Sequence, residues 1–499
     1  MTDASSSRAN DNPYLRLNVR PFINCASVRT IHGGSLMRAE VKAAMARAGG
    51  QFVNIYELME QAGKRIGELM GCEFGIVTPG SAAAVCLGTA GAVAGNDPER
   101  ISRLPLTEGM RNKVLMPKGH RFSYDHAIRM VGTTIHEFAS KDELEKLLED
   151  PTVAMICVYG LVEPSGPVSL EDMVALARPK NVPIMVDAAS EHIERPSPWL
   201  VRGADMVIYS GGKFLQAPQV TGLLLGKEKI IRAAWANASP HQGIGRPMKV
   251  SKEDIIGVVT ALEYWTTERD HPGERKQWAD DLDTIARKVT AVPGVEAKVR
   301  APSGGVKVPR LVISWDRSKV NQGGLDIRQR LLDGEPRIML DDMEATDRSV
   351  VVDPFNMVKG EAAVVGDALA RALSAKPVAV AAAAPSVKVD GSWDVTIDFG
   401  DGPATHRLEL TQADAKLGGR HKTKFFDSEV SGSVAGDRIT VSALHRYEGC
   451  RLGYRFEGTV KDGSMSGEVV LGTGGEAHQG PVNLAQYGKT TFAAKRVAG

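Results

Sequence analysis

The strongest constraint on the fold is an alternation of short apolar runs with amphipathic segments between Lys113 and Asp187. Val153–Tyr159 is almost continuously apolar, and Pro183–Asp187 is a second such run that ends in a carboxylate. Runs of this kind are typical of strands that are covered on both faces. Helical patterns such as Lys141–Leu148 and Leu170–Ala177 separate them. Repeated β-α-β units predict an α/β fold with a mostly parallel sheet and helices on both faces.

Ligands of such sheets gather beyond the carboxyl ends of the strands, and in Cys72–Val85 a short strand is expected to run into a glycine turn. A helix of small residues opens at this turn with Gly80, Ser81 and Ala82. A helix N-terminus presents free N–H groups and a positive dipole end, and small residues let an anion approach the backbone. The turn predicts a phosphate cradle. A plain strand–turn–helix packed by alanines is the alternative.

A lysine follows the apolar run Ala204–Ile208 after the turn Tyr209-Ser210-Gly211-Gly212, at Lys213. Burying an ammonium group costs several kcal/mol unless the group is paired or neutralised. A lysine at this place is therefore expected to be neutral and covalently engaged, and a Schiff base with pyridoxal phosphate (PLP) is the leading candidate. A solvated loop lysine is the alternative.

PLP needs a lysine, a carboxylate that keeps its pyridine nitrogen protonated, and an anion cradle. Asp187 ends a predicted strand 26 residues before Lys213, and Ser210 stands where its hydroxyl would reach the phosphate. An isolated aspartate at a strand end is more often a cap or turn residue. Together with the Gly80 turn, however, these residues predict a PLP site.

Several segments carry a family resemblance, namely FINCASVRTIHGGSLM, FVNIYELMEQAGKRIGELMGCEFGIVTPGSAAA, VDAASE, SGGKFLQAPQVTGLLLG and IGRPMKVSKEDIIGVVTALEYW. Over about residues 20–375 the chain resembles the selenocysteine-synthase-like group of fold-type I PLP enzymes, nearest to the D-glucosaminate-6-phosphate ammonia-lyase-like branch. The tRNA-acting selenocysteine synthase is a poorer match, because its separate tRNA-binding domain and a basic surface are lacking. The resemblance implies a seven-stranded PLP domain, a small C-terminal domain, and active sites shared in a homodimer or higher homo-oligomer.

The resemblance also implies roles for individual residues. Lys213 would hold the cofactor, Asp187 would face the pyridine nitrogen, and His120 would stack on the ring, although a structural histidine is an equal alternative. The cofactor-binding candidates are Gly80, Ser81, Ala82, His120, Asp187, Ser210, Lys213 and Gln219. Arg337 is the candidate for the substrate carboxylate, because a guanidinium binds a carboxylate bidentately, with an exposed ion-pair arginine as an equal alternative. Arg29, His32 and Arg246 are further substrate-binding candidates, with a surface or subunit-contact role as the alternative for each.

The predicted reaction removes ammonia from a β-hydroxylated amino acid or amino sugar acid and yields a 2-oxo acid. Freed Lys213 would remove the Cα proton as general base. An aminotransferase, a racemase or an aldol-type lyase would use the same residues, and sequence alone does not separate them. A non-catalytic protein that kept the PLP fold is the remaining alternative.

The rest of the chain divides into further predicted units: a disordered arm (1–20), a large PLP domain (21–270), a small α+β domain (271–375) whose first helix is Trp278–Val292, an Ala/Pro linker (376–388) and a C-terminal unit (389–499). The last has short alternating runs, among them Lys422–Ser428, at about ten-residue spacing. These runs predict an antiparallel β-barrel or sandwich. An accessory role is expected for it, with a ligand-binding barrel as the alternative.

Composition narrows the classes of function. The net charge of +1 provides no signal for nucleic acid or an anionic membrane surface. No apolar run approaches the ~20 residues needed to span a bilayer. The first twelve residues lack the apolar core of a signal peptide, and the five cysteines form no CxxC pair. We therefore expect a cytoplasmic enzyme without a metal site.

Overall fold

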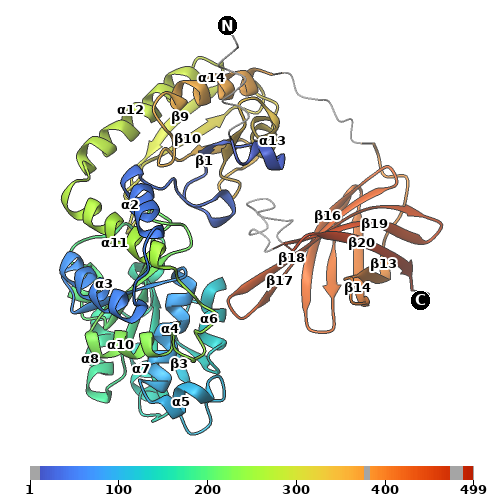
Figure 1. The fold of residues 1–499 in the computed structure, drawn as a ribbon. Coiled ribbons are helices and arrows are strands. Elements are labelled where there is room, and N and C mark those ends of the chain that lie inside the picture. The colour runs from blue at the N-terminus through green and yellow to red at the C-terminus, as the bar shows by residue number, and fades with distance from the viewer. Residues whose placement is uncertain (1–11, 376–382, 473–486, 498–499) are drawn as a thin grey trace.

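The computed structural model describes residues 12–375, 383–472 and 487–497, which form three hydrophobic cores. The cores belong to a large α/β domain, a small α+β domain and a C-terminal barrel (Figure 1). Residues 1–11 of the predicted arm and 376–382 of the predicted linker lie outside the described residues. Residues 12–20 include an exposed 3-10 turn, η1 (Leu15–Leu17).

The large domain is built on a seven-stranded sheet with the order β2-β8-β7-β6-β5-β3-β4. Its strands are β2 (Phe74–Thr78), β3 (Lys113–Pro117), β4 (Thr134–Phe138), β5 (Val153–Tyr159), β6 (Ile184–Asp187), β7 (Met206–Ser210) and β8 (Gly222–Gly226). Only β8 runs antiparallel to its neighbours. The predicted mostly parallel sheet is confirmed, and the carboxyl ends of the other six strands lie at one edge.

The helices of the large domain are α2 (Ala39–Gly49), α3 (Ile55–Met70), α4 (Ser81–Ala94), α5 (Pro98–Arg103), α6 (His126–Arg129), α7 (Lys141–Leu147), α8 (Leu170–Ala177), α9 (Pro198–Val201), α10 (Glu228–Ala236) and α11 (Lys252–Thr267). Short 3-10 turns are η2 (Thr30–His32), η3 (Ser123–Asp125), η4 (Gly160–Ser165) and η5 (Arg178–Lys180). Asn54 begins α3 by accepting a hydrogen bond from Tyr56 N at 2.9 Å. In α4, a Cβ on Gly88 would lie 2.6 Å from the sulfur of Met185, so glycine lets this helix lie close on the sheet.

The small domain packs its helices against a three-stranded antiparallel sheet of order β12-β10-β9. Its elements are α12 (His271–Val289), β9 (Val295–Arg300), β10 (Arg310–Trp315), α13 (Gly324–Asp333), β11 (Ile338–Leu340), β12 (Ser349–Val352) and α14 (Glu361–Ser374). Strand β1 (Ile23–Cys25), near the N-terminus, pairs in parallel with β11. This pairing carries the entry segment across the small domain before it reaches the large one.

The predicted start of the first small-domain helix at Trp278 is wrong. The helix begins at His271, where the Asp270 carboxylate accepts a hydrogen bond from Gly273 N at 2.9 Å and Pro272 occupies the first turn. The first two turns are half-buried to exposed and therefore polar, so their composition resembles that of a loop. The predicted end at Val292 lies three residues beyond the last helical residue, Val289.

The C-terminal unit is a closed antiparallel barrel in which each strand pairs with the next and β13 pairs with β20. Its strands are β13 (Gly391–Asp398), β14 (Pro403–Ala413), β15 (Lys416–Lys422), β16 (Asp427–Ala435), β17 (Arg438–Tyr447), β18 (Cys450–Lys461), β19 (Ser464–Gly472) and β20 (Lys489–Arg496). Side chains of alternating positions fill the interior, around Trp393 and Phe456. The choice between barrel and sandwich is thereby decided for the barrel.

One predicted barrel strand, Lys422–Ser428, is wrong. Lys422 ends β15 and residues 427–428 begin β16, whereas residues 423–426 form a turn in which the Thr423 hydroxyl accepts from Phe425 N at 3.1 Å and from Phe426 N at 2.9 Å. These bonds offer the backbone an alternative to a strand ladder. The strand before it, β15, was not predicted because glycines and charged residues interrupt its alternation.

Candidate active site

The lysine turn lies directly beyond the end of β7 and leaves no room for side chains before Lys213. A Cβ on Gly211 would lie 2.1 Å from Thr221 Oγ1, and one on Gly212 would lie 2.4 Å from Gln219 Cα. Ser35 Oγ donates to the carbonyl oxygens of Gly212 at 3.0 Å and Lys213 at 2.7 Å. The backbone of the lysine is therefore held both by the returning chain and by the N-terminal entry segment.

The Lys213 side chain points to the edge where the parallel strands end. Its Nζ donates to Ser190 Oγ at 3.0 Å. Burial lowers the pKa of Lys213, and the charge of Asp187 opposes that shift. The amine is therefore driven toward its neutral, nucleophilic form, as the sequence pattern requires.

Asp187 is the last residue of β6 and is 4% exposed. Its Oδ1 accepts from Ala189 N at 2.9 Å. Burial raises the pKa of Asp187, while this hydrogen bond and the charge of Lys213 act against the rise. A buried carboxylate that has no ion pair of its own among the described residues suits a cationic group of a ligand.

His120 follows β3 and is 1% exposed. Its Nδ1 accepts a hydrogen bond from Tyr159 N at 3.1 Å, whereas its Nε2 is buried without a partner in the described part of the chain. Burial lowers the pKa of His120 to about 4, so the ring is neutral near pH 7 and carries its proton on Nε2. The ring of Phe122 stacks on that of Tyr159 beside it, with centroids 5.0 Å apart. The unpartnered donor indicates a place for a ligand.

The Gly80 turn opens α4, a helix of 14 residues, with φ of 90° at Gly80. Amides of a first helical turn have no partner inside the helix, and this turn includes Ser81 and Ala82. On the neighbouring β8, a Cβ on Gly222 would lie 2.5 Å from Gly80 C and 2.6 Å from Ser81 N. Glycine at that position keeps the turn in its place, and the helix end is shaped for an anion.

Two other cofactor candidates lie around the lysine turn. Ser210 is half-buried at the end of β7. Gln219 is exposed, and its Nε2 donates to the Thr30 carbonyl at 3.2 Å, so it ties the turn to the entry segment.

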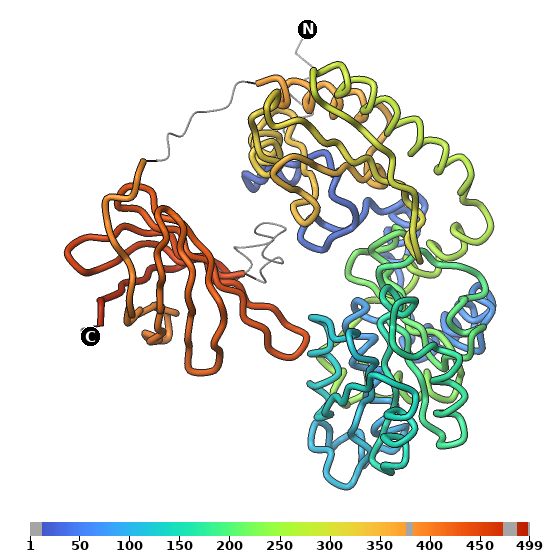
Figure 2. The backbone as a smooth tube through the Cα atoms, turned by 180° about the vertical axis from the view of Figure 1, so that it is seen from behind, coloured from blue at the N-terminus to red at the C-terminus, as the bar shows by residue number. Residues whose placement is uncertain are grey.

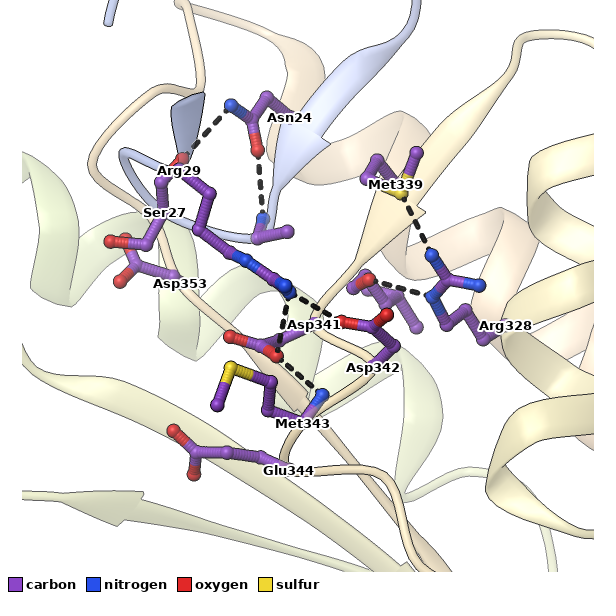
Figure 3. A network of polar contacts seen from close by, with 12 residues as sticks. Asn24, Ser27, Arg29, Arg328, Met339, Asp341, Asp342, Met343, Glu344 and Asp353 are labelled. Atoms are coloured by element: carbon purple, nitrogen blue, oxygen red, sulfur yellow. Dashed lines mark hydrogen bonds and ion pairs between the residues drawn. The ribbon is translucent and has the colours of Figure 1, made fainter. Parts of the chain in front are cut away.

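The basic substrate candidates are spread over three places. Arg29 forms ion pairs with Asp342 and, at 3.6 Å, with Asp341, and Figure 3 shows its guanidinium between the two carboxylates. An anionic substrate would compete with these carboxylates for Arg29. His32 is half-buried near it, and burial lowers the pKa of His32 to about 4.

The other two arginines differ in exposure. Arg337 is half-buried and donates from Nε to the Leu332 carbonyl at 3.0 Å and from Nη1 to the Arg20 carbonyl at 3.4 Å. Two of its three nitrogens thus already serve the backbone. Arg246 is exposed. No hydrogen bond or ion pair engages its guanidinium within the described residues.

Sequence reasoning missed three residues that support the site: Ser190, Tyr159 and Ser35. Ser190 bonds Lys213, Tyr159 N bonds His120, and Ser35 bonds the lysine backbone. Ser190 lies in the quoted VDAASE segment, three residues after Asp187, so its closeness to Asp187 was a usable signal. No local pattern marks Ser35, because it reaches the lysine turn from 178 positions away.

Comparison with known proteins places the chain. No family model matches it. It is 32% identical over 365 residues to D-glucosaminate-6-phosphate ammonia lyase of Salmonella typhimurium (strain 14028s / SGSC 2262), covering 71% of this chain and 96% of the relative. The solved structure of D-glucosaminate-6-phosphate ammonia-lyase superposes with a TM-score of 0.65 at 30% identity, covering 75% of this chain and 99% of that one. This chain belongs to the D-glucosaminate-6-phosphate ammonia-lyase family.

A second relative shows that chains similar to this one differ in reaction. The 5'-C-glycyluridine monooxygenase-decarboxylase of Streptomyces sp is 30% identical over 354 residues, covering 68% of this chain and 87% of the relative. Weaker matches to selenium transferases confirm the predicted selenocysteine-synthase-like group. About a quarter of this chain lies outside the match to the solved ammonia-lyase, and the barrel with its linker is a segment of that size.

The family implies PLP, and the residues at the strand ends fit it. Three groups lie where β7, β6 and β3 end at one sheet edge: the amine of Lys213, whose pKa burial lowers, the buried carboxylate of Asp187, and the Nε2 of His120, which has no partner among the described residues. The end of α4 supplies the anion cradle. No helix in the described ranges is long and apolar enough to cross a membrane, and no cluster of metal-ligating side chains occurs in them.

Proposed function

We propose that the chain is a PLP-dependent ammonia lyase that acts on a β-hydroxylated amino acid, most specifically an amino sugar acid. The observation that carries the proposal is a lysine whose pKa is lowered by burial, placed beside a buried carboxylate at the strand ends of a chain in the ammonia-lyase family. When bound, PLP supplies an electron sink for a pair of electrons at Cα.

The roles of the residues follow from their surroundings. Ser190 accepts a hydrogen bond from the amine of Lys213, and the lowered pKa of Lys213 favours the form that can take a proton from the substrate Cα. Asp187 would keep the pyridine nitrogen protonated, because an ion pair with it offsets the cost of burying the carboxylate. His120 would cover the ring and donate from Nε2, and the amides of Ser81 and Ala82, with the Ser210 hydroxyl, would hold the phosphate.

The substrate-binding residues belong to the same proposal. Arg246 is exposed in the single chain, which suits a guanidinium that completes the site of a neighbouring subunit in a homo-oligomer. Arg337, Arg29 and His32 remain candidates, and their existing bonds set what a substrate anion must displace or share.

Product analysis tests the reaction. The PLP-loaded protein is offered D- and L-hydroxyamino acids and amino sugar acids with and without a phosphate, and ammonia and 2-oxo acid are measured together. Equal amounts of both products from a hydroxylated substrate, without an added amino acceptor, are expected. Product formation only with an added 2-oxo acid would indicate a transaminase instead. Consumption of oxygen with release of carbon dioxide would indicate a monooxygenase-decarboxylase reaction, as named for the Streptomyces relative.

A colourless protein that PLP cannot reconstitute would contradict the proposal at an earlier step.

The role of Arg246 in substrate binding is tested with Arg246→Ala. Arg100→Ala is the matched control, since it also removes an exposed arginine and Arg100 lies on α5. We expect a raised KM only for Arg246→Ala.

A further inference from the structure

The hairpin that joins β17 to β18 reaches from the barrel to the large domain (Figures 1 and 2). Its turn consists of Glu448 and Gly449, and we call residues 447–450 the docking turn. The Glu448 carboxylate forms an ion pair with Arg121, and the guanidinium of Arg129 lies over the Tyr447 ring at 5.8 Å. The contact therefore joins a barrel hairpin to the segment that follows β3.

The docking turn approaches the large domain with its backbone. A Cβ on Gly449 would lie 2.1 Å from the Phe122 carbonyl oxygen and 2.5 Å from Asp125 Oδ2. Cys450 Sγ lies 3.9 Å from the Ser123 carbonyl oxygen. Only glycine permits this approach, so the turn and residues 122–125 are complementary in shape as well as in charge.

Arg121 links the two sides of this contact. Its Nε donates to Asp125 Oδ2 at 2.6 Å, its Nη1 lies 3.6 Å from Glu137 Oε1, and its Nη2 pairs with Glu448. Asp125 is fully buried. The barrel thus contributes one of three carboxylates around a guanidinium whose neighbour in the chain is His120.

The contacts continue inward to the lysine. Phe122 stacks on Tyr159, and Tyr159 N bonds His120. Burial raises the pKa of Tyr159, and the Ser190 side chain, which accepts from Lys213, opposes that rise. Residues 119–125, here the His120 loop, therefore lie between the docking turn and the site.

We propose that the barrel is a built-in part of the active site, whose Glu448 and Gly449 hold the His120 loop in position. This proposal rests on the proposed function only in taking the strand-end site as the cofactor site. Glu448 and Gly449 are positioning residues, because they contact the loop and not the reacting atoms. A C-terminal barrel thereby shapes a site that lies in the large domain.

The docking itself is tested on the cofactor-free protein with Ser123→Cys, which adds a thiol to the residue whose carbonyl oxygen lies 3.9 Å from Cys450 Sγ. Mild oxidation is expected to give a disulfide within one chain, seen by peptide mass mapping, and Gly449→Ala in the same background should slow its formation at least fivefold. Gly418→Ala is the matched control, because a Cβ there meets only the Thr411 hydroxyl at 3.3 Å. A disulfide between two chains, or none, would overturn the proposal.

The positioning role is tested by amide exchange of residues 119–125, again without cofactor. Glu448→Gln and Gly449→Ala should raise exchange in this loop at least threefold, while Glu429→Gln, an exposed barrel carboxylate, should not. After loading, the same two variants should release PLP at least threefold faster. Loop exchange equal to that of the controls would reject the positioning role even if the docking turn is in contact.

The two proposals fail separately. Amide exchange and crosslinking are measured on the apoprotein, so they test the docking of the barrel without any assay of the reaction. Amide exchange of β13 shows whether Gly449→Ala has unfolded the barrel. Glu448→Gln changes only a surface side chain in the turn, so it tests the positioning of the His120 loop without disturbing the barrel.

Discussion

The active site and the barrel interior both bury polar groups, but they satisfy them differently. In the barrel, His406 Nδ1 lies 3.0 Å from His421 Nε2, and His421 Nδ1 lies 2.9 Å from His445 Nε2. Ser428 closes the chain by bonding His445 Nδ1 at 2.7 Å. At the active site, by contrast, His120 Nε2 is buried without a partner among the described residues.

This contrast separates structural from functional burial. A buried polar group costs free energy unless it is hydrogen-bonded, so a complete chain of imidazoles is stable without a ligand. Groups left incomplete at the strand ends are stable only because the rest of the fold holds them, and a ligand can complete them. Burial drives both sets toward neutrality, since it lowers the pKa of Lys213 and of all three barrel histidines.

The largest expected effect comes from removing the amine of Lys213 in the active site. Lys213→Ala should lose the cofactor absorbance that borohydride bleaches, and should lower turnover by at least about 10³-fold, because it removes both the attachment point and the general base. Lys227→Ala, a lysine paired with Asp205 at the opposite end of the sheet, is the control. Borohydride labelling that persists in the Lys213 variant would contradict the assignment.

Asp187→Asn should have the next largest effect. The amide can still accept from Ala189 N, so the fold and cofactor attachment should survive, but the charge opposite the pyridine nitrogen is lost. Turnover should fall by about 10²-fold or more, the magnitude typical of a lost electrostatic contact in a site. Asp205→Asn serves as the matched variant, and similar losses in both would remove the proposed role of Asp187.

The histidine chain predicts an acid-labile barrel. Burial lowers the pKa of His421 to about 3 and of His406 to about 4, so the unfolded chain takes up protons first as the pH falls below about 6.5. The stabilisation is complete above that pH and is lost toward pH 4, by about 3 kcal/mol or more.

Amide exchange of strands β13–β19 between pH 7 and pH 4, corrected for intrinsic rates, measures this loss. His421→Phe should be less stable at pH 7 and lose less stability on acidification, because one titrating group is gone. His136→Gln, outside the barrel on β4, should behave as the wild type. An unchanged pH dependence in His421→Phe would show that the chain does not set acid stability.

The smallest expected effect concerns Glu191, a buried residue next to Ser190 whose Oε1 has no hydrogen-bond partner among the described residues. Burial raises its pKa to about 7, with the Trp199 hydrogen bond opposing the rise. The folded state therefore holds this proton to higher pH, and stability is lost as the pH rises from about 4.5 through 7. Glu191→Gln should stabilise the protein by about 2 kcal/mol at pH 8 and hardly at pH 5. Thermal unfolding at both pH values measures this; an equal shift at both would refute it.

Much of the central sheet could be predicted because its signals are local. Val153–Tyr159 was predicted with the observed bounds, since an unbroken apolar run identifies a strand covered on both faces. The start of the helix at His271 was not predicted, because its first turns are polar. The turn at Thr423 was not predicted either, because a side-chain hydrogen bond to the backbone replaces the strand pairing there. For the site, the order of turn, acid and lysine was readable, and their individual roles remain predictions.

The amino-acid sequence by itself determined the strand-and-helix alternation, the Gly211-Gly212 turn and the chemical set of lysine, aspartate and helix end. These depend on contacts between residues close in the chain. Only the tertiary structure decided that Ser35 holds the lysine turn, that Arg29 is paired with Asp342, and that a barrel turn presses on the His120 loop. Such contacts join residues that are far apart in sequence, and their free energy exists only once the intervening chain has folded.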